Sequence, residues 1–194
     1  MDIQLHNVSK SFEGKSILKD LNITFPEGRL SCLMGASGIG KTTVVNIIMG
    51  LIKPDSGEVA GTKQKKVAAV FQEDRLIEHW DAVRNIGLVC GKAVTEEAIV
   101  QELNKVGITD CRNKAVKDFS GGMRRRVALV RAVLAKSDII IMDEPFKGLD
   151  EGLKDQVIEY VRENTKGKTV IVITHDREEV GRLGAGLVQL EGQS

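Results

Sequence analysis

A glycine-rich segment followed by a lysine and a threonine has the clearest chemistry in this chain. It reads GASGIGKT at residues 35–42 and matches the spacing G-x-x-x-x-G-K-[ST]. Glycines let such a loop wrap tightly, so that backbone N–H groups and the N-terminus of the following helix form an anion site. The lysine can contact β- and γ-phosphates, and the threonine hydroxyl can bind Mg²⁺. The segment therefore predicts a site for the phosphates of a nucleotide.

Two adjacent acids, Asp143 and Glu144, follow an apolar run at 139–142. Parallel sheets gather their sites at the carboxyl ends of strands, so this pair can face the phosphate loop. Asp143 can then hold Mg²⁺, and Glu144 can orient or deprotonate an attacking water. A competing interpretation is that the two acids only cap a helix that starts near Pro145.

The elements expected to position these residues alternate between strands and helices. Residues 21–25 alternate between apolar and polar, as in a half-buried strand, and the first thirty residues are typical of short strands. Runs that are apolar at nearly every position indicate strands buried on both faces. These runs lie at 30–34, 67–71, 139–142 and 170–174. Helical spacing occurs at 41–51, 98–106 and 123–134, which predicts an α/β fold.

The composition is that of an ordinary globular protein. The 194 residues are 42% hydrophobic and 28% charged, and the net charge of +1 gives no general attraction to nucleic acid or anionic lipid. No apolar run approaches the roughly 20 residues that span a bilayer, and the first residues lack a signal-peptide pattern. Cys32, Cys90 and Cys111 are scattered, which favours a reduced, cytoplasmic protein.

The order of the motifs resembles that of the nucleotide-binding subunit of an ABC transporter. After the phosphate loop come Gln72 in VFQEDRL, the segment FSGGMRRRVALVRAVL at 119–134, the acids of MDEP, and then GLD and ITHD. The segment at 119–134 is similar to the signature of the family and is the most diagnostic part. The resemblance covers nearly the whole chain, and its details are similar to importer ATPases of the nitrate, sulfonate and taurine type.

The resemblance implies an α/β fold of the P-loop NTPase class. It has a mainly parallel core sheet, an N-terminal antiparallel β subdomain and a short α-helical signature subdomain. Residues 1–194 would form a single ABC ATPase domain, with the β subdomain and RecA-like core at 1–79 and 136–194 and the helical lobe at 80–135.

The resemblance also implies ATP and Mg²⁺ as cofactors and gives each site residue a role. The expected catalytic residues are Glu144, His175, Lys41 and Gln72. The expected metal-binding residues are Thr42, Gln72 and Asp143. The expected nucleotide-binding residues are Phe12, Gly35, Ala36, Ser37, Gly38, Ile39, Gly40, Lys41, Thr42, Thr43, Ser120, Gly121, Gly122 and Asp150. Phe12 would stack on adenine, with a place in the core as the alternative, and His175 would contact the γ-phosphate.

A second anion site is predicted where Ser120, Gly121 and Gly122 precede a helix. In the family this site meets the γ-phosphate that the other protomer holds, so that two ATP molecules lie between head-to-tail subunits. The resemblance therefore implies a second ABC ATPase subunit as partner, with a homodimer on ATP binding as the simpler form. Asp150 would act across that interface.

The further partners implied are an integral membrane permease on a separate chain and, in the complex, a solute-binding protein. The chain would then lie at the cytoplasmic face of the cell membrane as a peripheral subunit. Trp80 follows Gln72 and is expected either to contact the permease or to lie in the core. The basic run at 124–126 is interpreted as a solvated helix face, so no nucleic-acid partner is expected.

The predicted function is an ATP-binding and ATP-hydrolysing subunit that powers solute transport, in the direction of import, through the separate permease. A soluble ABC ATPase without a transport role is the alternative, and a regulatory module that binds nucleotide with little hydrolysis is a third. Lys147 and Gly148 depart from the small residues usual in the family, and the helical lobe is short. Cargo is not predicted, because in this family the permease and the binding protein select it.

Overall fold

The computed structural model of the chain describes residues 1–91 and 94–191. A five-stranded parallel sheet with the strand order β5-β6-β7-β3-β8 forms its centre. The strands are β3 (Leu30–Met34), β5 (Val67–Val70), β6 (Ile139–Asp143), β7 (Thr169–Ile173) and β8 (Gly186–Gln189). The apolar runs of the sequence thus form neighbouring strands, and their carboxyl ends share one edge of the sheet.

A second, antiparallel sheet has the order β2-β1-β4. Its strands are β1 (Ile3–Phe12), β2 (Lys15–Phe25) and β4 (Ser56–Ala60). The prediction of short strands in the first thirty residues was wrong, because β1 and β2 are long. Register shifts along β1 and a left-handed backbone at Asn7 interrupt the apolar alternation, so one bulged strand has the pattern of two short ones.

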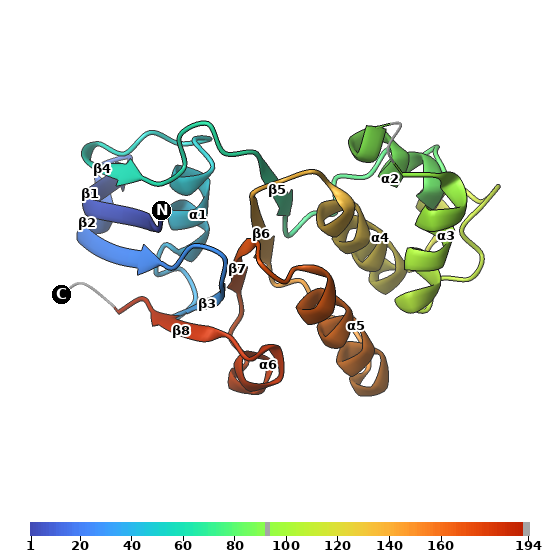
Figure 1. The fold of residues 1–194 in the computed structure, drawn as a ribbon. Coiled ribbons are helices and arrows are strands. Elements are labelled where there is room, and N and C mark those ends of the chain that lie inside the picture. Colours follow the sequence, from blue (N-terminus) through green and yellow to red (C-terminus); the bar gives the residue numbers. More distant parts are fainter. Residues whose placement is uncertain (92–93, 192–194) are drawn as a thin grey trace.

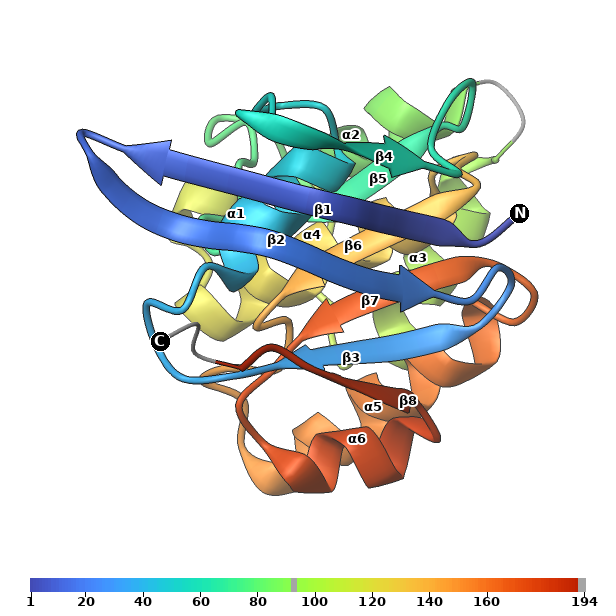
Figure 2. The same ribbon diagram turned by 90° about the vertical axis from the view of Figure 1, so that its left-hand side faces the viewer.

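The two faces of the parallel sheet contribute to two separate cores. In β6, Ile139 and Ile141 pack with the antiparallel sheet and with α1 (Lys41–Ile48), whereas Ile140 and Met142 pack with the helices of the other face. Figure 2 shows the antiparallel sheet as a layer over α1 and the parallel strands. The prediction of strands buried on both faces is confirmed for β3, β6 and β7. It was wrong for the run at 67–71, because β5 lies at the edge of the sheet and Val67 is exposed.

Three helices gather at one end of the molecule, far from the antiparallel sheet (Figure 1). They are α2 (Ala82–Cys90), α3 (Glu96–Lys105) and α4 (Gly121–Leu134). Two more, α5 (Glu151–Asn164) and α6 (Arg177–Leu183), lie beside the parallel strands.

The predicted α/β fold with a parallel core sheet and an N-terminal antiparallel sheet is confirmed. Within the described residues, no helix is long and apolar enough to cross a bilayer.

Candidate functional site

The glycine-rich segment connects the end of β3 to the start of α1. Gly40 is the N-cap residue of α1 and has a φ of 108°, a backbone angle that residues other than glycine rarely adopt. A Cβ atom there would lie 2.8 Å from the Leu18 side chain, so the position requires glycine. Because Gly40 has no side chain to cap the helix, the first N–H groups of α1 face the loop and can bind an anion.

Lys41 and Thr42 tie this loop to the centre of the site. The Lys41 ammonium donates to the carbonyl oxygens of Gly35 and Ala36 at 2.8 and 2.9 Å. The Thr42 hydroxyl donates to Asp143 Oδ2 at 3.1 Å, across 101 residues of sequence. Hydroxyl and carboxylate oxygens are ligands that Mg²⁺ prefers, so the two predicted metal ligands lie where one ion can reach both.

A cavity of about 270 Å³ opens above the loop and the ends of the strands. Its lining residues are Phe12, Ile17, Ser37, Gly38, Gly40, Lys41, Thr42, Thr43, Gln72, Asp143, Glu144 and Ile173. The structure therefore brings the phosphate loop, the glutamine after β5 and the two acids to one place. Gly35, Ala36 and Ile39 belong to the same loop but do not line the cavity, and Ile39 packs against the core under the antiparallel sheet.

Phe12 ends β1 at the rim of this cavity and is 43% exposed, so the alternative that it lies in the core is wrong. The Lys10 ammonium lies 5.4 Å from the centre of its ring. An exposed aromatic ring beside a phosphate loop can stack against a flat base.

The two acids at the end of β6 differ in environment. Burial raises the pKa of Asp143, an effect that the hydrogen bond from Thr42 opposes. A hydrogen bond from Lys147, at 2.8 Å, lowers the pKa of Glu144 and favours its ionised form. A turn follows Glu144, and α5 begins only at Glu151 with Asp150 as its N-cap residue. The interpretation of the two acids as helix caps is therefore wrong.

His175 comes from the end of β7, the strand next to β6. Its Nδ1 atom lies 3.5 Å from Glu144 Oε1, so the predicted catalytic histidine meets the predicted base. An ion-pair network fixes the segment that carries it. The Lys154 ammonium lies 2.7 Å from Asp176 Oδ2 and 3.0 Å from Glu179 Oε1, and the other oxygen of Glu179 accepts from the Thr174 hydroxyl.

Replacing Lys154 by methionine should lower the free energy of unfolding by about 3 kcal/mol at pH 7, because the largely buried Glu179 carboxylate loses its cation. The Lys154 hydrogen bond lowers the pKa of Asp176 below its ordinary 3.8. The interaction between Lys154 and Asp176 thus stabilises the fold above pH 3.8, and this contribution is lost as the pH falls through the lowered pKa of Asp176. Urea unfolding at several pH values should show the difference from wild type shrinking in acid.

Lys166 provides the control for that measurement, since its ammonium pairs with Glu163 on the surface. Replacing Lys166 by methionine should change stability by less than about 1 kcal/mol at any pH. Equal losses in the two variants would show that the network around Lys154 is no stronger than a surface pair.

The remaining predicted site residues lie outside the cavity. Ser120 is the N-cap residue of α4, and its hydroxyl accepts from the Met123 N–H at 3.2 Å. Gly121 is exposed beside it, and a Cβ atom on Gly122 would contact the turn at 148–149, just before Asp150. Ser120, Gly121, Gly122 and Asp150 thus form a second location, and their role toward a nucleotide stays a prediction.

The interpretation of the arginine run as a solvated face was wrong for two of its members. Arg125 and Arg126 are only 6% and 7% exposed. Every residue of α4 from Arg125 to Val130 is buried, because this helix packs between the parallel sheet and the other helices. A basic tripeptide at a helix start gives no signal of such burial, so sequence reasoning missed both residues.

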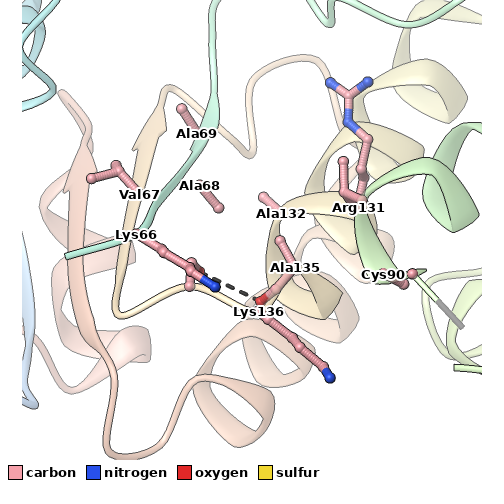
Figure 3. Close-up of a pocket in the computed structure, with 12 residues that line it drawn as sticks. Lys66, Val67, Ala68, Ala69, Cys90, Arg131, Ala132, Ala135 and Lys136 are labelled. Atoms are coloured by element: carbon pink, nitrogen blue, oxygen red, sulfur yellow. Dashed lines mark hydrogen bonds between the residues drawn. The ribbon is translucent and has the colours of Figure 1, made fainter. Parts of the chain in front are cut away.

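A larger groove of about 800 Å³ lies between β5, α2 and α4 (Figure 3). Several alanine and valine residues line it, and Val89 of α2 is 42% exposed. Lys66, Arg131 and Lys136 supply positive charge, and among the described residues no acid lines the groove. Arg131 also donates to the carbonyl oxygens of Asp74 and Arg75, so the groove adjoins the loop that follows Gln72.

Curated proteins similar to this chain are import ATP-binding proteins. It is 34% identical over 195 residues to "Spermidine/putrescine import ATP-binding protein PotA" of Fusobacterium nucleatum, covering 92% of this chain and 52% of that protein. It is 33% identical over 195 residues to "Sulfate/thiosulfate import ATP-binding protein CysA" of Synechocystis, covering 92% and 55%. The chain thus spans about half the length of the curated relatives it matches.

Solved structures and a family model also resemble this chain, as ABC transporter cassettes. The structure titled "Dimeric Structure of MJ0796, a Bacterial ABC Transporter Cassette" superposes with a TM-score of 0.84 at 29% identity, covering 97% of this chain and 94% of that one. A post-hydrolysis state of MJ0796 bound to ADP and Pi superposes with a TM-score of 0.85 at 27% identity, covering 99% and 97%. The family model described as ABC transporter matches residues 18–147, and the chain belongs to that family.

Proposed function

We propose that the chain is the ATP-binding and ATP-hydrolysing subunit of an ABC importer and drives a separate membrane permease. The observation that carries this proposal is the single cavity in which the phosphate loop, Gln72, Asp143 and Glu144 meet. The contact between Glu144 and His175 supports hydrolysis rather than binding alone, because it places a base and a histidine together beside the phosphate site.

In this proposal the phosphates of ATP lie on the N–H groups of the loop and the start of α1, with Lys41 as their cation. The structure fits Mg²⁺, since Thr42 Oγ1 and Asp143 Oδ2 lie 3.1 Å apart. The ion would neutralise charge that develops on the phosphates during hydrolysis. Glu144 would then accept a proton from the attacking water. His175, whose Nδ1 atom lies 3.5 Å from Glu144 Oε1, would contact the γ-phosphate.

We also propose that two copies of the chain pair head to tail when ATP binds. Ser120, Gly121 and Gly122 lie outside their own protomer's cavity, and Ser120 begins a 14-residue helix. A second copy could place this helix start against the γ-phosphate. The dimeric structure of the similar cassette MJ0796 supports this arrangement.

The groove between β5, α2 and α4 is the proposed docking surface for the permease. It is apolar and basic, and Arg131 links it to the loop that follows Gln72. A permease segment in the groove could therefore influence the catalytic cavity. The helical lobe proposed at 80–135 provides one wall, and binding there would place the chain at the cytoplasmic face of the membrane.

In this proposal the partner proteins, rather than this chain, select the cargo. Relatives with similar identity are named for polyamine, Fe³⁺ or sulfate import. The nitrate, sulfonate and taurine type stays a prediction from the motifs, and a solute-binding protein completes the proposed complex.

The transporter proposal is tested by purifying the tagged chain from detergent-solubilised membranes of its native host and identifying its partners by mass spectrometry. We expect a stoichiometric multi-spanning protein. Replacing Val89 by glutamate should release it, whereas the same change at Leu187, an exposed residue on β8, should retain it. Only soluble partners in repeated purifications would favour a soluble ABC ATPase without a transport role.

A further inference from the structure

The guanidinium of Arg125 lies behind the catalytic cavity and bonds two loops at once. Its Nη1 atom donates to the carbonyl oxygens of Phe71 and Gln72 and to Asp74 Oδ1, the last two at 3.3 Å. Its Nη2 atom donates to the carbonyl oxygens of Asp143 and Glu144, the latter at 2.8 Å. Arg125 itself does not line the cavity.

Three of these five acceptors belong to residues that are assigned a role in the proposed chemistry. Gln72, Asp143 and Glu144 line the cavity, and their backbone carbonyls accept from the arginine. The loops come from β5 and β6, and the arginine comes from α4. A guanidinium is planar, and its donors stand in a fixed fork, so one group sets the distance between the two loops.

We propose that Arg125 is a positioning residue for ATP hydrolysis, which holds Gln72 in register with Asp143 and Glu144. This inference rests on the proposed function of the cavity. Arg125 then affects the rate of hydrolysis rather than the affinity for ATP, because it forms no hydrogen bond with the phosphate loop. These bonds also explain how a buried cation with one carboxylate partner, Asp74, is accommodated: four backbone carbonyls share its charge.

Arg126, the next residue, provides a matched comparison. It is as buried as Arg125, and its guanidinium also donates to backbone carbonyls. Its acceptors are Val106 and Gly107, which follow α3, and Gly122, which belongs to the proposed second anion site. None of the three lines the catalytic cavity. The same substitution at the two positions therefore removes similar bonds from different loops.

The test replaces each arginine by lysine, which keeps the charge but has one compact ammonium that cannot bridge two loops. We expect similar losses of melting temperature in R125K and R126K. At a temperature where both are folded, R125K should have a kcat about tenfold or more below that of wild type, with KM for Mg-ATP within about threefold of wild type. A wild-type kcat in R125K, or a change confined to KM, would overturn the proposal.

Amide hydrogen exchange gives a second measurement that needs no hydrolysis. R125K should exchange faster than wild type at 71–76 and 143–147, and R126K should do so at 104–110. Absence of ATPase activity in wild type would reject the proposed function while this exchange pattern still supported the positioning of the two loops. Unchanged exchange at 71–76 and 143–147 in R125K would reject the positioning role even in an active enzyme.

Discussion

Replacing Glu144 by glutamine lowers kcat for ATP hydrolysis by about 100- to 10,000-fold, the range in which a general base contributes. Glutamine keeps the size of the side chain but cannot accept the proton of the attacking water. Glu144 lines the cavity without contacting the phosphate loop in any hydrogen bond of the described chain, so ATP affinity should stay within about threefold. Phosphate release and equilibrium binding of ATP measure the two quantities separately.

Glu163 provides the control, since it lies on the exposed end of α5 and pairs with surface lysine and arginine. Its change to glutamine should leave kcat within about twofold, as expected for a surface ion pair. An E144Q protein that hydrolyses ATP at the wild-type rate would show that Glu144 is not the base. That result would not contradict the fold or the phosphate site.

E144Q also tests the proposed dimer. If ATP joins two protomers and hydrolysis separates them, the variant should remain dimeric with ATP and be monomeric with ADP. Light scattering coupled to gel filtration distinguishes these states. A monomer under all conditions, with ATP bound, would reject the head-to-tail arrangement and leave the signature residues without a role toward nucleotide.

The core of the site could be predicted from sequence because its parts follow local rules. The phosphate loop has a fixed spacing, and the acids stand directly after an apolar run. Parallel topology then brings strand ends together, so Thr42 and Asp143 meet although 101 residues separate them. This prediction required only that the carboxyl ends of the parallel strands share one edge of the sheet. It required no knowledge of side-chain packing.

The surroundings of the site could not be predicted, because they depend on contacts between distant elements. Arg125 has the local sequence of a surface residue, and only the packing of α4 against β5 and β6 shows that its guanidinium is buried. The groove between β5, α2 and α4 likewise has no continuous motif. In β1, the bulge near Asn7 breaks the alternation that would have revealed one long strand.

Replacing Lys41 by alanine should weaken ATP binding by about 10- to 100-fold and reduce hydrolysis below detection. The loop's own carbonyls at Gly35 and Ala36 accept from the ammonium, which holds Lys41 at the cavity. The cation is therefore already in place when the phosphates arrive, and little side-chain entropy is lost on binding. Isothermal titration of the variant with Mg-ATP and with Mg-ADP measures the effect.

The losses of affinity for ATP and for ADP, compared with each other, show which phosphates Lys41 contacts. If Lys41 contacts both the β- and γ-phosphates, K41A should lose more affinity for ATP than for ADP, because one more charged contact is removed. Changing Lys166 to alanine, an exposed lysine outside the cavity, should alter neither affinity. Equal losses for ATP and ADP would confine the lysine to the β-phosphate. Unchanged affinity for both would mean that the ammonium stays on the loop carbonyls and that the helix N-terminus alone binds the phosphates.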